Sequence, residues 1–147
     1  MKSLMLTALA AGCLQLAGCA AEGPAAPPAP KALTLENTYW KLTSIGETPV
    51  EVAKDPRDPH LVLQSRDHRV DGADGCGRLR GSYLTEGSSV SFVQIASGKA
   101  GDCLAGVRDG QAMQRALAGV SRWRIVGREL ELMNERDATL ARFQAGE

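Results

Sequence analysis

From residue 33 onward, hydrophobic and polar side chains alternate in short segments, which is typical of half-buried strands in an antiparallel sheet. In the first of these segments Trp40 and Leu42 alternate with polar neighbours, and a turn is expected at Gly46. The same pattern recurs at 61–63, around 70, at 79–83, 90–95, 123–125, 130–132 and 140–143. It predicts seven or eight strands. Gly81, between Leu79 and Tyr83, indicates a bulge or a close backbone contact.

One segment departs from this alternation. Hydrophobic residues between positions 103 and 120 recur at spacings of three and four, which predicts an α-helix with an apolar stripe. Asp102 is placed to cap it. Gly106 and Gly110 weaken its first half by up to about 1 kcal/mol each relative to alanine, so we expect the firm part to begin near Asp109. The stripe consists of Val107, Gly110, Met113, Leu117 and Val120. The predicted fold class is α+β: a curved antiparallel sheet, an open or cracked barrel, packed with one α-helix.

The N-terminal residues have a different character. Lys2 gives a positively charged start, and residues 4–16 form an apolar run that is too short to span a bilayer, which takes about 20 residues. The run ends in Leu16-Ala17-Gly18-Cys19, which resembles a bacterial lipoprotein signal. The resemblance implies cleavage between Gly18 and Cys19 and a lipid on the Cys19 thiol. We therefore expect a membrane anchor through an N-terminal lipid, facing the periplasm.

The next segment predicts a spacer. Residues 20–32 are rich in alanine and proline and contain almost no large apolar side chain, so they cannot form a core. At about 3.1 Å per residue in polyproline geometry the segment reaches about 40 Å. Ala20 lacks the aspartate that marks inner-membrane retention in enterobacteria, which favours the outer membrane. The expected organisation is a signal peptide at 1–18, a lipidated tether at 19–32 and one domain at 33–147.

Charge excludes one class of partner. The sequence has 17 basic and 17 acidic side chains and a net charge of zero, so no long-range field favours nucleic acid or an anionic membrane surface. Two Arg-Xxx-Arg pairs, Arg78 with Arg80 and Arg122 with Arg124, fit the solvent face of a strand better than a binding stripe.

The cysteines predict a disulfide. Signal cleavage removes Cys13 and lipidation occupies Cys19, which leaves Cys76 and Cys103 as a pair in an oxidising compartment. Two independent thiols, or a metal or redox centre, are the alternatives. A redox centre favours Cys-x-x-Cys, and a structural zinc site needs two further ligands. A disulfide is the simplest interpretation.

The sequence offers no catalytic motif. It has no Gly-x-Ser-x-Gly, and we expect its two histidines, His60 and His68, in a charged loop and a turn. Asp67, Asp71 and Asp74 surround a glycine-rich turn, where aspartates are ordinary turn residues more often than calcium ligands. We therefore predict no catalytic, cofactor-binding or metal-binding residues and no small-molecule substrate.

The aromatic side chains allow two interpretations. Trp40, Tyr83, Phe92 and Trp123 either line a pocket for an acyl chain or form the core. The core is the favoured interpretation, because a domain with so few aromatic residues needs them to fill its interior.

The order of several short motifs resembles the META domain family of HslJ-type lipoproteins over residues 35–143. The motifs are Tyr39-Trp40-Lys41-Leu42, a Gly-x-x-Pro-Val turn at 46–50, Gly72-x-x-Gly75-Cys76-x-x-x-x-Gly81-x-Tyr83, a second cysteine at Cys103 and a final strand pair. The resemblance implies a lipid-anchored, non-enzymatic envelope module that binds an unidentified envelope protein or supports stress tolerance. A further likeness, to type III secretion pilotins, implies a carrier or chaperone for an apolar chain or secretion-system segment. A carrier requires an apolar cavity of about 300 Å³ or more, lined by the strand aromatics.

Overall fold

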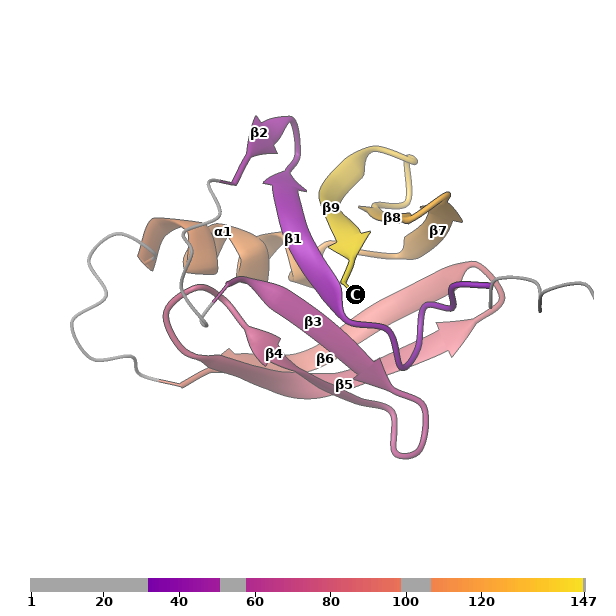
Figure 1. Ribbon diagram of the computed structural model, residues 1–147, viewed down its shortest axis with the longest axis horizontal. Coiled ribbons are helices and arrows are strands. Elements are labelled where there is room, and N and C mark those ends of the chain that lie inside the picture. The colour runs from indigo at the N-terminus through magenta and orange to yellow at the C-terminus, as the bar shows by residue number, and fades with distance from the viewer. Residues whose placement is uncertain (1–31, 51–57, 99–106, 147) are drawn as a thin grey trace, which may run out of the picture. The chain divides into compact units, whose positions relative to one another are not determined.

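The computed structural model describes residues 32–50, 58–98 and 107–146, and these form nine strands and one helix (Figure 1). The strands are β1 (Trp40–Ile45), β2 (Thr48–Pro49), β3 (His60–Gln64), β4 (Arg69–Ala73), β5 (Arg78–Glu86), β6 (Ser89–Ser97), β7 (Arg122–Val126), β8 (Glu129–Met133) and β9 (Thr139–Ala145), and the helix is α1 (Val107–Ala118). The predicted sheet with one helix is confirmed. The additional strand is β2, two residues that pair with the end of β1 where the sequence indicated a turn.

The strands form a ring. Their order is β2-β1-β3-β4-β5-β6-β7-β8-β9, every pair is antiparallel, and β9 pairs back onto β1. The ring is not a regular barrel, because β6 and β7 share a single register pair, Ser89 with Arg122. Helix α1 contacts β6, β9 and β1, so it packs against the ring beside this weak joint.

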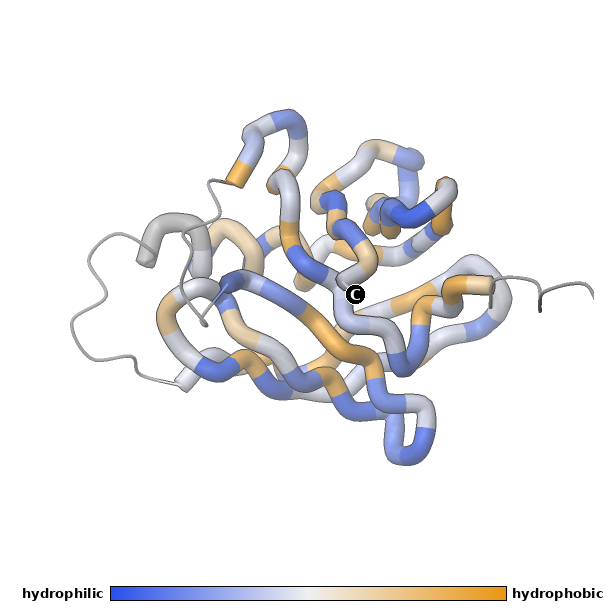
Figure 2. Tube along the Cα trace, viewed as in Figure 1, coloured by the Kyte–Doolittle hydropathy of each residue, from blue (hydrophilic) through white to orange (hydrophobic). Residues whose placement is uncertain are grey.

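Alternation along the strands separates the core from the outer face. Figure 2 shows hydrophobic and hydrophilic residues alternating along β3 to β5. Leu79 and Tyr83 of β5 are fully buried, and Trp40 of β1 is fully buried with them. Phe92 and Trp123 are partly buried and pack against this core. The aromatic side chains therefore form the core, as predicted, and each fully buried one stabilises the fold by about 1.5 to 3 kcal/mol.

Helix α1 contributes apolar side chains to the same core. Met113 and Leu117 have no exposed surface, and Val120 is buried just after the helix. Gly110 is explained by packing: a Cβ there would lie 2.9 Å from the Asp74 carboxylate and 3.1 Å from the Asp74 carbonyl oxygen. Asp102 and Gly106 lie outside the described residues. Among the described residues, no helix has the length and hydrophobicity needed to cross a membrane.

The bulge predicted at Gly81 is present. The register between β5 and β6 shifts between Arg80 and Ser82, and Gln94, on the opposite strand, has a φ of 53°. A Cβ on Gly81 would lie 2.5 Å from the Cδ1 atom of Ile95. The same Cβ would lie 3.0 Å from the Val93 carbonyl oxygen and 3.1 Å from the Ile95 Cα, so the opposite strand leaves little room for a side chain.

Candidate functional site

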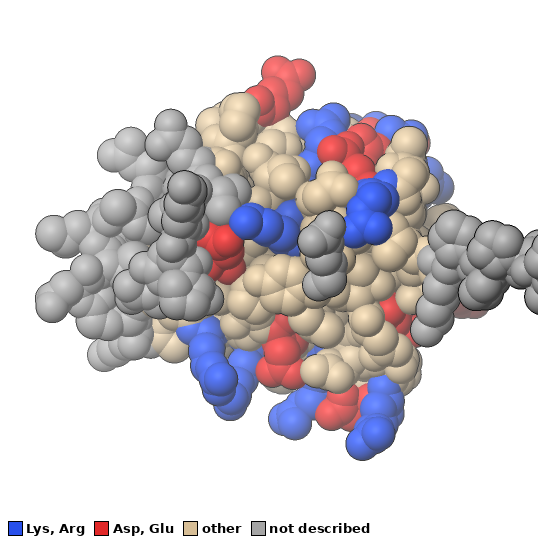
Figure 3. All heavy atoms as spheres, viewed as in Figure 1, with Lys and Arg blue, Asp and Glu red and all other residues tan. Residues whose placement is uncertain are grey.

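A groove of about 650 Å³ lies on the outer face of the sheet, along β4 and the strands on either side of it, β3 and β5. Its size is within the range of ligand-binding pockets. Figure 3 shows basic and acidic groups interleaved along this part of the surface. The lining residues are His60, Gln64, Asp71, Gly72, Ala73, Cys76, Gly77, Arg78, Leu79 and Arg80.

The groove exists because the outward side chain at its centre, that of Ala73, is small. Ala73 of β4 lies in register between His60 of β3 and Arg78 of β5, so a methyl group separates two long side chains. At the next position, a Cβ on Gly72 would lie 2.1 Å from the carbonyl oxygen of His60. The backbones of β3 and β4 therefore approach too closely for any residue but glycine.

The β5 side of the groove presents two arginines that differ in their partners. Arg78 is exposed and faces Ala73, and it makes no ion pair with any side chain in 32–50, 58–98 or 110–146. Arg80 faces Asp71, with 3.9 Å between Nε and the carboxylate, and both side chains are more than half exposed. An exposed ion pair of this length stabilises the fold by less than about 1 kcal/mol. Both guanidinium groups are therefore available to an anionic ligand.

The β3 side of the groove is formed by an ordered histidine. His60 Nδ1 lies 2.7 Å from the carbonyl oxygen of Asp58 and so donates to it, and the ring of Tyr39 stacks on the imidazole with centroids 4.5 Å apart. Lys41 Nζ lies 2.7 Å from the Asp58 carboxylate. Partial burial and then the Asp58 charge raise the pKa of Tyr39. The sequence placed His60 in a loop, which is wrong: it pairs with Ala73 as the first residue of β3.

The turn between β4 and β5 closes one end of the groove, and Asp74 organises it. Asp74 is 4% exposed, and its Oδ1 accepts hydrogen bonds from the amides of Gly77 at 2.8 Å and Cys76 at 3.0 Å. Its Oδ2 accepts from Gln114 Nε2 of α1 at 3.2 Å. Burial alone would raise the pKa of Asp74, but the hydrogen bonds from Gly77, Ser97, Cys76 and Gln114 lower it overall. Asp74 thus joins the turn to the helix.

Asp67 and Asp71, the other aspartates of this region, do not form a cluster with Asp74. Asp67 is exposed in the turn between β3 and β4, as predicted for a turn residue. Asp71 is in β4, so the turn prediction is wrong for it. Within the described part of the chain no three metal-binding side chains come together. Cys76 lies in the β4–β5 turn, whereas Cys103, Gly18 and Cys19 lie outside the described residues, so lipidation and the disulfide stay predictions.

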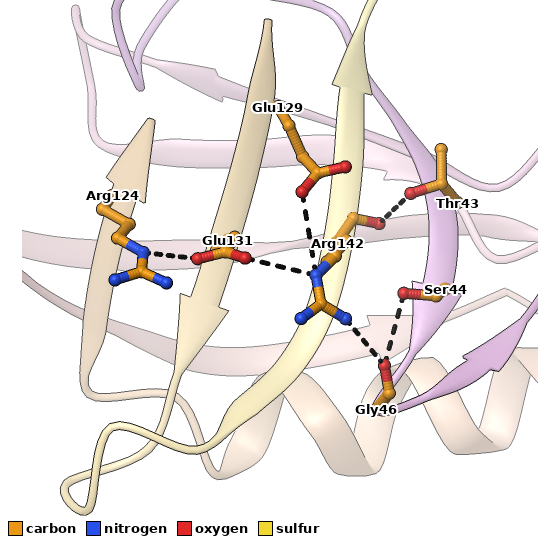
Figure 4. A network of polar contacts seen from close by, with 7 residues as sticks. All are labelled: Thr43, Ser44, Gly46, Arg124, Glu129, Glu131 and Arg142. Atoms are coloured by element: carbon orange, nitrogen blue, oxygen red, sulfur yellow. Dashed lines mark hydrogen bonds and ion pairs between the residues drawn. The ribbon is translucent and has the colours of Figure 1, made fainter. Parts of the chain in front are cut away.

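The second Arg-Xxx-Arg pair, on β7, has close acidic partners. Arg122 lies 2.8 Å from the Asp137 carboxylate, and Arg124 pairs with Glu131 of β8. Glu131 also accepts from Arg142 Nε of β9 at 3.2 Å, and Figure 4 shows this ladder of charges across three strands. The solvent-face prediction is confirmed for all four arginines, since each is exposed. Only the pair on β5 borders the groove.

Sequence reasoning singled out Arg124 of this ladder, but not Glu131 or Arg142. The signal was present, because Glu131 and Arg142 occupy outward positions between buried neighbours in β8 and β9. What the sequence lacks is the register that sets Glu131 opposite both Arg124 and Arg142. Cross-strand pairs of this kind are visible only once the strands are aligned.

A ring-like antiparallel sheet with one helix and a groove on its outer face defines a small α+β domain. The META domain model matches residues 33–147, and the chain belongs to the META domain family. This family is not a known enzyme family, and membership supports a cell-envelope-type module of unclear role.

Solved structures share the fold. An NMR structure of a protein from Burkholderia xenovorans is 19% identical, with a TM-score of 0.62, over 84% of this chain and 98% of that one. A crystal structure of a DUF4847 family protein from Bacteroides vulgatus is 13% identical, with a TM-score of 0.57, over 75% of this chain and 93% of that one. No curated protein sequence matches the chain.

Proposed function

We propose that this protein is a lipid-anchored module of the cell envelope whose META domain binds another envelope protein and performs no catalysis. The observation that supports binding is the groove on the outer face of β3 to β5, where Arg78 and Arg80 face solvent beside small side chains. Family membership supports an envelope role. The sequence from Leu16 to Cys19 supports the lipid anchor.

The anchor has a direct test. In Cys19→Ser no thiol is available for the lipid, so the protein is expected to leave the membrane fraction. Cys13→Ser, which changes a cysteine within the apolar run, is the matched control and is expected to fractionate like the wild type. Because Ala20 follows the lipidated cysteine, we propose the outer membrane, and separating the two membranes on a density gradient tests this. Unchanged fractionation of Cys19→Ser would contradict the anchor.

We also propose that Cys76 forms a disulfide with Cys103. Cys76 lies in the turn that Asp74 joins to Gln114 of α1, and Cys103 precedes the first residue of that helix by four positions. A bond that closes this loop of about 27 residues stabilises the fold by roughly 3 to 4 kcal/mol. Thiol labelling of the unfolded mature protein without reductant is expected to modify neither cysteine. Labelling of both would refute the bond.

Partner binding is tested by crosslinking in intact cells. A photoreactive amino acid at Ser82, exposed on the outer face of β5, is expected to capture one reproducible envelope protein. The same group at Gln111, exposed on α1, is the control and is expected not to capture it. Recovery of the same protein from both positions, or of none from Ser82, would count against binding through this face.

A role in stress tolerance follows from the same proposal. Cells that lack the protein are expected to survive heat shock less well than the parent strain. Wild-type protein is expected to restore survival, and Cys19→Ser to fail. Equal rescue by both would separate the stress role from the anchor.

The carrier alternative has no specific observation in its favour. Two hollows lined by described residues are the groove on β3 to β5 and a second of about 450 Å³ beside the β5–β6 hairpin. Neither is lined by the strand aromatics that a carrier was expected to use. Trp40 and Tyr83 are instead fully buried in the core.

A further inference from the structure

We infer that the groove binds an extended acidic segment of the partner protein, two of whose carboxylates, at positions i and i+2, contact Arg78 and Arg80. The inference rests on the proposed function, because it names the chemistry of the bound partner. It depends on three features of the groove: its charge, the spacing of its arginines and its course along a strand.

Charge comes first. Cross-strand register decides which arginines have an acidic partner: Arg78 faces Ala73, whereas Arg124 faces Glu131. Arg78 therefore has no ion-pair partner among the side chains of residues 32–50, 58–98 and 110–146, and Arg80 has only a long pair with Asp71. A planar guanidinium binds a carboxylate through two parallel hydrogen bonds. The groove thus offers two sites for carboxylates.

Spacing favours a peptide over a single phosphate. Arg78 and Arg80 are two residues apart on one face of β5, and strand geometry places such positions about 6.6 to 7 Å apart. An extended peptide presents its own side chains i and i+2 at the same spacing. Two carboxylates on one face of such a peptide therefore match the spacing of the two arginines, whereas one phosphate engages both guanidinium groups only if the two side chains converge.

The shape of the groove fits the same ligand. It follows β4, where the small side chain of Ala73 leaves room for a peptide backbone between His60 and Arg78. Asp71 contributes one negative charge, held by Arg80 and by Gln64 Nε2 at 3.4 Å. That charge repels a dianionic phosphate more strongly than a monoanionic carboxylate. The groove is therefore suited to a peptide of moderate negative charge.

The test uses full-length protein purified in a non-ionic detergent and a fluorescein-labelled nine-residue peptide with Asp-Thr-Asp at its centre. Fluorescence anisotropy is expected to show binding that weakens as NaCl is raised. Arg78→Gln with Arg80→Gln is expected to weaken binding about tenfold or more. Arg122→Gln with Arg136→Gln removes the same charge from exposed positions on β7 and the β8–β9 turn, and a change of less than about twofold is expected.

Two control peptides test the spacing. Asn-Thr-Asn removes the charge, and Asp-Asp-Thr places the carboxylates on opposite faces of an extended chain, so both are expected to bind more weakly than Asp-Thr-Asp. Circular dichroism confirms that each variant is folded. The inference is overturned if Asp-Thr-Asp does not bind, if the Arg78 and Arg80 variant binds it equally, or if inorganic phosphate binds where the peptide does not.

The same variants separate this inference from the proposed function. If crosslinking from Ser82 still captures the partner after Arg78 and Arg80 are changed, the acidic-segment inference fails and partner binding stands. If no partner is captured but the peptide binds as expected, the groove chemistry stands and the proposed partner binding fails.

Discussion

The guanidinium of Arg142 donates to the buried carboxylate of Glu131 at 3.2 Å (Figure 4). Glu131 is 7% exposed, and Arg124 binds its other oxygen from the opposite side. Arg142 also donates to the carbonyl oxygen of Gly46 at 3.3 Å, which connects β9 to the turn between β1 and β2. One buried charge thus links β7, β8, β9 and β1 on the outer face of the ring.

Glu131 is expected to make stability depend on acid pH. The hydrogen bond from Arg124 is the largest cause that lowers the pKa of Glu131, and it outweighs burial. Because the folded-state pKa lies below the ordinary value of 4.5, this contribution is complete above about pH 4.5 and is lost as pH falls through the folded-state pKa. Glu131→Gln is expected to cost about 1 to 2 kcal/mol at pH 7 in urea unfolding.

The difference in the free energy of unfolding between wild type and Glu131→Gln is expected to shrink as the pH is lowered toward 3. Glu135→Gln is the matched control, because Glu135 is exposed in the turn between β8 and β9, and we expect it to change stability by less than about 0.5 kcal/mol. A gap between wild type and Glu131→Gln that stays constant from pH 7 to pH 3 would contradict the role of the charge.

Asp74 is expected to stabilise the fold through the backbone amides that donate to it. Asp74→Ala leaves the Cys76 and Gly77 amides without their acceptor and is expected to destabilise the fold by about 3 kcal/mol. Asp74→Asn retains an oxygen for the turn and is expected to cost about 1 kcal/mol. Thermal unfolding of both variants measures their relative stability. An equal loss of stability in the two would show that the hydrogen bonds from the Cys76 and Gly77 amides contribute little.

Gly110 is expected to resist replacement although it lies in a helix. Alanine gains about 1 kcal/mol in helix propensity, but its Cβ would lie 2.9 Å from an Asp74 carboxylate that is fixed by hydrogen bonds. We expect Gly110→Ala to destabilise the fold by about 1 to 2 kcal/mol in urea unfolding. In an Asp74→Ala background the carboxylate is gone, so the penalty is expected to fall. Stabilisation by Gly110→Ala in the wild type would refute the close contact.

Tyr83 is expected to hold Glu36 and Asn37, which precede β1, against the sheet. Its hydroxyl donates to the Glu36 carboxylate and lies 3.1 Å from the Gln64 carbonyl oxygen, while the Asn37 amide donates to the Leu63 carbonyl oxygen. Tyr83→Phe is expected to cost about 1 kcal/mol and to speed hydrogen exchange at the Asn37 amide. Unchanged exchange at that amide would contradict the role.

The same hydroxyl predicts an alkaline effect. Burial, and then the hydrogen bond to Glu36, raise the pKa of Tyr83 above the ordinary 10.0. The stabilisation is therefore complete below pH 10 and is lost as the pH rises above it. In Tyr39→Phe, Tyr83 is the remaining tyrosine of the two in the chain, and its phenolate absorbance at 295 nm is expected to appear only as the protein unfolds. Ionisation near pH 10 in the folded protein would contradict this.

Much of the fold follows from local pattern. Alternation around Leu79 and Tyr83 predicted β5, and a spacing of three and four through Met113 and Leu117 predicted α1, because each pattern places apolar groups on one face of its element. Gly81 predicted the bulge. The strand β2 was missed because two residues are too few to show a period.

The site was less accessible to the same reasoning. His60 was placed in a loop, because its neighbours at 54–59 are charged or proline, yet pairing with Ala73 makes it part of β3. Gly110 was treated as a weakness of the helix, since nothing local shows that Asp74, 36 positions away, packs against it. The groove itself depends on Ala73 lying between the longer side chains of His60 and Arg78 on the two neighbouring strands.

The sequence by itself determined where the strands and the helix lie and which side of each strand faces solvent, because these follow from side-chain periodicity along one segment. It treated Arg78 with Arg80 and Arg122 with Arg124 as equivalent. The tertiary structure separated them: register places Glu131 opposite Arg124 and Ala73 opposite Arg78. Which charge meets a partner depends on residues far apart in the chain, so only the folded sheet decides which arginines stay available for binding.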